Sequence, residues 1–108
     1  MTTKVMILAG MLAVGVAGAL RAQQPADAAS TYAKTCASCH GAKGSPSPTM
    51  AHSMGIPDFA GGAVAAVPDS VLKSVIANGK GRLMPGYKTR FTAEQIAALV
   101  AYLRTFKQ

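Results

Sequence analysis

The chain is poor in the large side chains and cross-links that usually stabilise a small domain. It contains no Trp, only three Phe and only two Cys in 108 residues. The two cysteines, Cys36 and Cys39, lie so close together that a disulfide between them would close a very short loop and would restrict the unfolded chain little. A domain of this size buries a small core and usually needs a further stabilising element. A group other than a disulfide must therefore supply that element.

Two further absences exclude classes of protein. No segment alternates apolar and polar residues over a useful length, so the strands and helices of a thioredoxin-like thiol–disulfide oxidoreductase are not expected. Cys36, Cys39 and His40 do not suit a structural zinc site, because three such close ligands are one too few and too crowded for a tetrahedron. No repeats and no second domain are visible in the sequence.

The N-terminal residues 1–22 have the pattern of a secretory signal peptide. Lys4 gives a short basic start, and residues 5–20 are free of charge and almost wholly apolar or glycine. Small residues favour cleavage after Ala22 or Ala19. The alternative is an uncleaved membrane anchor, but residues 5–20 are at the short edge of the about 20 residues needed to cross a bilayer. Either way, we expect the domain of residues 23–108 to lie outside the cytoplasm, in the periplasm or an equivalent compartment.

The sequence predicts an all-α domain. Three main helices are predicted, over residues 27–40, 69–77 and 92–106. Asp27 can cap the first helix, and Thr92 with Gln95 forms a capping box at the start of the last. The apolar stripe of the first helix ends on the first cysteine and consists of Ala29, Tyr32, Ala33 and Cys36.

Long loops separate the predicted helices. Glycines and prolines punctuate residues 41–62 and 80–91, so neither segment is expected to form a long regular element. A short helical turn is predicted over residues 49–54. We expect the first and last helices to pack together through small side chains, those of Ala29, Ala33, Ala97 and Ala98.

The strongest functional pattern is the C-x-x-C-H motif of Cys36, Cys39 and His40, which marks the attachment of a c-type haem. On a helical turn these residues fall at i, i+3 and i+4, which is one face. Two thiols there can add to the two vinyl groups of one haem, and the neighbouring imidazole can reach its iron. The haem, a large apolar ring, would also be the missing stabilising element. The motif therefore predicts one covalently attached haem c with its iron.

The occupant of the second axial position on the iron decides the function. Met84 is the preferred candidate, because it lies far along the chain in a glycine- and proline-rich loop between two helices. Met50, His52 and Met54 are the alternatives, although a methionine more commonly fills gaps in a core. A thioether ligand favours reduced iron and closes it to small molecules, which points to electron transfer rather than to oxygen or peroxide chemistry.

The sequence resembles the class I cytochromes c, which are small exported monohaem electron carriers. The resemblance rests on the attachment motif (residues 36–41), the methionine loop (residues 81–87) and the last helix (residues 96–104). It implies a small cytochrome c-like domain whose three main helices and long loops wrap one covalently attached haem.

The same resemblance implies a role for each site residue. Cys36 and Cys39 would form the thioether bonds, His40 would be the proximal ligand and Met84 the distal ligand. In the family, a proline carbonyl in the following loop orients the proximal imidazole. By position, this carbonyl would belong to one of two residues, Pro46 or Pro48.

Outside the leader, the chain carries nine basic and four acidic residues, a formal charge of +5. Several basic residues surround Met84 or the haem motif in sequence: Lys43, Lys73, Lys80, Arg82, Lys88 and Arg90. Such a ring would steer an acidic-surfaced redox protein, whereas the alternative is an ordinary solvated surface. Nucleic acid is not expected as a partner, and the membrane is expected only if the leader is retained.

These observations predict a one-electron carrier that cycles between Fe(III) and Fe(II) and has no substrate chemistry of its own, so we expect no enzyme. The alternatives are a haem catalyst or gas sensor with an open sixth iron site, and a c-type haem subunit of a dehydrogenase or oxidase complex.

Overall fold

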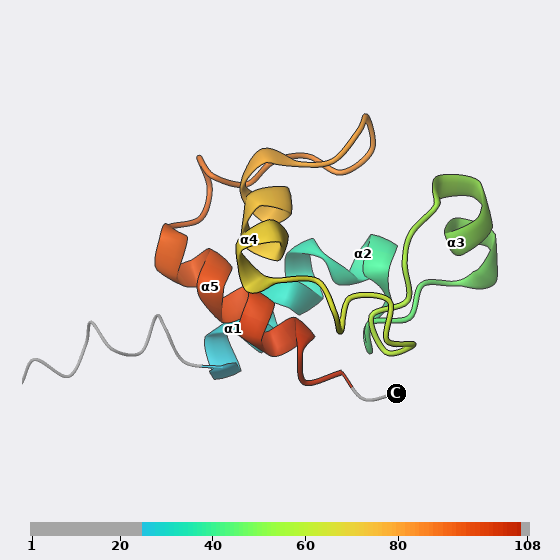
Figure 1. The fold of residues 1–108 in the computed structure, drawn as a ribbon, viewed down its shortest axis with the longest axis horizontal. Helices are drawn as coiled ribbons and strands as arrows, with labels where there is room; N and C mark the ends of the chain where they lie inside the picture. Colours follow the sequence, from blue (N-terminus) through green and yellow to red (C-terminus); the bar gives the residue numbers. More distant parts are fainter. Residues whose placement is uncertain (1–24, 107–108) are drawn as a thin grey trace, which may run out of the picture.

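The computed structural model describes residues 25–106, which form helices joined by long loops (Figure 1). The helices of this range are α1 (Pro25–Thr35), α2 (Ala37–His40), α3 (Pro48–Met54), α4 (Asp69–Asn78) and α5 (Ala93–Leu103). No strand occurs within residues 25–106, where a single isolated bridge pairs Lys80 with Met84. The prediction of an all-α domain is confirmed. None of the helices in this range is long and apolar enough to span a membrane, and the predicted leader, residues 1–22, lies outside the described residues.

The predicted helix over residues 27–40 is in fact two helices. It begins earlier than expected, at Pro25, so Asp27 lies in its first turn rather than at its cap. It is interrupted at Cys36, whose φ of −111° and ψ of −35° separate α1 from α2. Hydrogen bonds still run through this residue, because its N–H donates to Tyr32 and its carbonyl accepts from His40. The interruption therefore lies in the torsions of one residue, while the hydrogen bonds of the helix continue across it.

The other two main helices agree closely with the sequence. α4 ends at Asn78, where Gly79 takes a φ of 81°. At the start of α5, the Gln95 N–H donates to Thr92 Oγ1 over 3.1 Å, and the Thr92 N–H donates back to Gln95 Oε1 over 2.8 Å. The capping box is thus present. α5 stops at Leu103, short of the predicted residue 106, because the N–H groups of Thr105 and Phe106 bond carbonyls three residues back rather than four.

The core lies where α5 packs against α1 and α4 (Figure 1). One buried cluster joins Tyr32 of α1 to Leu99 and Leu103 of α5. A second joins Val100 of α5 to Leu72 of α4 and Val64 of the preceding loop. The predicted contact between the first and last helices is confirmed, but one of its expected residues is wrong. Ala33 is exposed, and Ala28 is the buried alanine of α1.

Two sets of polar contacts fix the long loops. The Arg104 guanidinium, just after α5, donates to Asp69 over 2.8 Å and to the Val64 carbonyl over 2.6 Å. The Ser45 hydroxyl donates to Asp58 over 2.7 Å. This second bond closes the loop that carries α3, which lies apart from the α1–α5 crossing (Figure 1).

Candidate functional site

The haem-motif residues lie together on α2 and the residue before it. Cys36, Cys39 and His40 are all half-buried, and neither cysteine is in a disulfide. Burial, and then the neighbouring Cys39, raises the pKa of the Cys36 thiol. The two thiols and the imidazole therefore lie within one helical turn, with Cys36 at its N-cap, as expected.

The His40 ring lies against an aromatic side chain that the sequence did not single out. It stacks on Phe59, with the ring centroids 4.7 Å apart and the planes 17° apart. Burial lowers the pKa of His40 and so favours the neutral imidazole, the form that binds iron. Its Nδ1 atom is buried and has no hydrogen-bond partner.

The expected proline carbonyl does not meet this nitrogen. Because His40 Nδ1 has no partner, neither Pro46 nor Pro48 orients the ring by a hydrogen bond in this structure. A hydrogen bond is found instead at Gly41, the residue after His40. Gly41 offers its carbonyl to the hydroxyl of Tyr32, which donates to it over 2.7 Å.

A small apolar cavity of about 30 Å³ adjoins the motif. Aromatic and aliphatic side chains from α1, α4, α5 and the loop after α3 line it together with two motif residues: Tyr32, Cys36, His40, Phe59, Ile76, Leu99 and Leu103. Two thiols, a neutral imidazole and an apolar surround are the donor set of a covalently attached haem. The chemistry of these residues therefore suits this group.

Met84 lies on a different element, in the hairpin between α4 and α5. It is half-buried, and its backbone pairs with Lys80 through N–H to carbonyl distances of 3.0 and 3.4 Å. Gly79 and Gly86 have no side chain, so this hairpin can approach the end of α4 closely. A Cβ on Gly79 would lie 2.6 Å from the Met84 carbonyl, and one on Gly86 would lie 2.7 Å from the Ala77 carbonyl.

The structure does not bring Met84 into the cavity beside His40, whose lining it does not join. The other candidates lie on α3, where Met50 and Met54 are half-buried and His52 is exposed. The assignment of Met84 as an iron ligand stays a prediction. The hairpin that carries it is nevertheless tied to α4 by two further bonds, since the Tyr87 and Lys88 N–H groups donate to Ile76 and Ala77.

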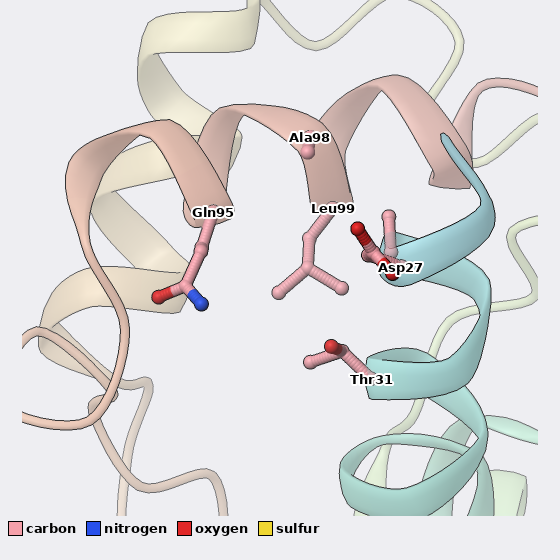
Figure 2. Close-up of a pocket in the computed structure, with 6 residues that line it drawn as sticks. Asp27, Thr31, Gln95, Ala98 and Leu99 are labelled. Carbon is pink, nitrogen blue, oxygen red and sulfur yellow. The ribbon is translucent and has the colours of Figure 1, made fainter. Parts of the chain in front are cut away.

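A second and larger cleft, of about 300 Å³, lies between α1 and α5. Figure 2 shows Asp27 and Thr31 of α1 facing Gln95 and Leu99 of α5 across it. None of the haem-motif residues lines this cleft. It is therefore distinct from the candidate haem site.

Two residues, Phe59 and Tyr32, contribute to the site through contacts that no local sequence pattern indicates. Phe59 follows His40 by a long, irregular segment, and no local pattern joins the two. Tyr32 was identified only as part of an apolar stripe, although its hydroxyl has a specific partner in Gly41. The C-x-x-C-H motif was found because its residues are contiguous, whereas these contacts depend on the fold.

Comparison with known proteins gives one family and several solved structures. The family model of cytochrome c oxidase, cbb3-type, subunit III matches residues 23–103. The structure is similar to that of the KustC0563 c-type cytochrome, with a TM-score of 0.67 and 29% sequence identity over 75% of this chain and 98% of that chain. It also resembles the c-type cytochrome NirC, with a TM-score of 0.57 and 22% identity over 73% and 86% of the two chains. A search of curated proteins gave no match.

Proposed function

The chain belongs to the family of cytochrome c oxidase, cbb3-type, subunit III, and from this premise we propose that it is a one-electron carrier with one haem c ligated by His40 and Met84. Membership of the c-type cytochromes already makes it a haem protein of electron transfer. The proposal adds the attachment through Cys36 and Cys39, the two ligands, the compartment and the partner.

The observation that carries the proposal is the donor set on α2. Cys36 and Cys39 would hold the haem through thioether bonds. Burial lowers the pKa of His40 and so favours the neutral imidazole, which would bind the iron. When bound, the haem iron supplies a couple between Fe(III) and Fe(II) that takes up and releases one electron. The chain itself needs no group that transfers protons or forms a bond to a substrate.

The Met84 hairpin supports the second ligand. A ligand that must face the haem needs a fixed backbone, because a small displacement would lengthen its bond to iron. Here the backbone is fixed by its pairing with Lys80 and by the close approach of Gly79. A soft thioether in that position would raise the reduction potential relative to a second histidine.

We further propose that the protein works outside the cytoplasm and meets an acidic-surfaced redox protein. Four basic side chains near the hairpin are exposed, those of Lys80, Arg82, Lys88 and Arg90. Within residues 25–106, the one ion pair joins Arg104 to Asp69. The hairpin cations are therefore available to steer a partner, an effect that falls as ionic strength rises.

The family description supports a second candidate, a c-type haem subunit of an oxidase complex. The two candidates share the same site and differ in association. A free carrier would purify alone from the extracytoplasmic fraction, whereas a subunit would remain with a membrane complex that contains further haem.

Optical spectra of the exported protein, oxidised and reduced, test the proposal. We expect covalently bound haem and, in the ferric state, a methionine–iron charge-transfer band. Met84→Ala should abolish this band, and Met54→Ala, a matched change on α3, should leave it. Absence of haem after expression with the maturation machinery would refute the proposed function. Haem without the band, together with rapid binding of carbon monoxide, would instead identify an open-site catalyst or sensor.

A further inference from the structure

The orientation of the His40 ring has no hydrogen bond to explain it. An iron-bound histidine usually donates its second ring N–H to a carbonyl, carboxylate or water, and this bond fixes the ring. Here Nδ1 is buried and no protein group accepts from it. The ring is instead stacked on Phe59 at 4.7 Å between centroids. The plane of the His40 ring is therefore set by stacking on Phe59 rather than by a hydrogen-bond acceptor.

A chain of hydrogen bonds holds Phe59 in register with the motif. The hydroxyl of Tyr32, a residue only 1% exposed, donates to the Gly41 carbonyl. The same carbonyl accepts from the Gly44 N–H over 3.2 Å, and the Gly44 carbonyl accepts from the Phe59 N–H over 2.8 Å. The chain starts beside the core of α1 and ends at the ring under His40.

The first of these bonds requires the chain to depart from a straight helix between Tyr32 and Gly41. Tyr32 and Gly41 are nine residues apart, which would separate them by about 13.5 Å along a straight α-helix. Side chains on a helix also point back toward its N-terminus, away from Gly41. Two departures from helical geometry lie between the hydroxyl and the carbonyl, the break at Cys36 and the exit of the chain at Gly41, whose φ is 83° and ψ 148°.

We propose that Phe59 is the positioning residue of the proximal histidine, and that the Tyr32 hydroxyl holds Phe59 in place through Gly41 and Gly44. This inference rests on the proposed function, since it concerns the residue that would bind the iron. Stacking on Phe59 would orient the His40 ring in place of a hydrogen bond from its Nδ1 atom. Because stacking leaves the Nδ1 proton without an acceptor, the imidazole is also a weaker donor to iron than one that is hydrogen-bonded.

The chain offers a matched control for Phe59. Phe91 is also half-buried and packs on the same core cluster. It stacks on Tyr87 with centroids 5.4 Å apart and planes 15° apart. Phe59→Leu and Phe91→Leu therefore each remove one stacked ring of similar burial, but only Phe59→Leu removes the ring that faces His40.

The test uses the haem-loaded protein and two measurements. The paramagnetic shifts of the haem methyl groups in ferric protein report the orientation of the axial ligands, and hydrogen exchange at the Nδ1 proton of His40 reports local opening around the ring. We expect Phe59→Leu to redistribute the methyl shifts and to speed this exchange by about 3- to 10-fold, as for loss of one aromatic pair. Phe59→Tyr should restore the parent values, and Tyr32→Phe should change them in the same direction by less.

The outcomes separate this inference from the proposed function. A chain that matures without haem would overturn both. Normal haem attachment with the same methyl shifts and exchange rates in Phe59→Leu and Phe91→Leu would overturn the positioning role alone. Thermal unfolding provides a check on folding. Phe59→Leu should lose at least as much stability as Phe91→Leu, because Phe59 packs on both core clusters and Phe91 on one.

Discussion

Three glycines around Met84 allow the effect of backbone strain to be separated from that of close packing. Gly79 has a φ of 81°, and a Cβ there would meet the Met84 carbonyl at 2.6 Å. Gly81 has a φ of 61° but open space around it. Gly86 has no positive φ, yet a Cβ there would meet the Ala77 carbonyl at 2.7 Å. Alanine at these positions therefore tests strain with a clash, strain alone and a clash alone.

The expected losses follow from these distances. Placing alanine at a positive φ costs about 1–2 kcal/mol, so Gly81→Ala should lower the free energy of unfolding by that amount and the melting temperature by about 4–8 °C per kcal/mol. At Gly79 or Gly86, ordinary contact begins at 3.4 Å, so backbone must move by about 0.7 Å at a cost of about 1–3 kcal/mol. Gly79→Ala combines both effects and should lose about 2–5 kcal/mol.

The assay pairs denaturant unfolding with the methionine–iron charge-transfer band of the ferric protein. A shift of the Met84–Pro85 backbone should weaken or abolish this band in Gly79→Ala and Gly86→Ala. Gly81→Ala should keep it, in spite of its lower stability. If Gly81→Ala lost the band while Gly86→Ala kept it, the hairpin would not be positioned by its contact with α4, and the reasoning would be refuted.

Two further predictions concern the polar links of the loops. Arg104→Ala should lower the free energy of unfolding by about 2–3 kcal/mol, because the Arg104 guanidinium donates to backbone carbonyls as well as to Asp69. Asp69→Asn should lower it by under about 1 kcal/mol. Equal losses of the two variants in urea titrations would contradict this prediction. The Ser45 hydroxyl, and then backbone N–H groups, hold the pKa of Asp58 below its usual value, so this carboxylate stabilises the fold above its unfolded pKa of about 3.9 and loses that effect as the pH falls through the lower folded value. Urea midpoints should therefore fall more steeply below pH 4 in the parent than in Ser45→Ala, and parallel curves would argue against the assignment.

The main helices could be predicted because their determinants are local. The Thr92–Gln95 capping box and the stop at Gly79 involve residues within one turn of each other, and the structure contains both. The end of α5 could not be predicted in this way. Phe106 lies beyond the helix, with its ring centroid 5.1 Å from that of Tyr32. This contact joins residues that are far apart in the sequence.

The site divides along the same line. A contiguous motif identifies Cys36, Cys39 and His40, because attachment chemistry requires that spacing. No glycine or proline marks the break at Cys36, and the bond that accompanies it joins Tyr32 to Gly41, nine residues further along the chain. The proline expected to orient His40 was inferred from a family resemblance, whereas this chain presents Phe59 to that ring.

The two candidate ligands are held by different kinds of contact, and this has a consequence for how the surface can vary. His40 depends on side chains, since an aromatic face and a tyrosine hydroxyl position its surroundings. The Met84 hairpin depends on backbone bonds and on glycines, so its outward side chains carry little of its geometry. Leu83, next to Met84, is 62% exposed. Substitutions at the hairpin tip should therefore leave the backbone at Met84 in place, whereas substitutions around His40 should disturb its surroundings.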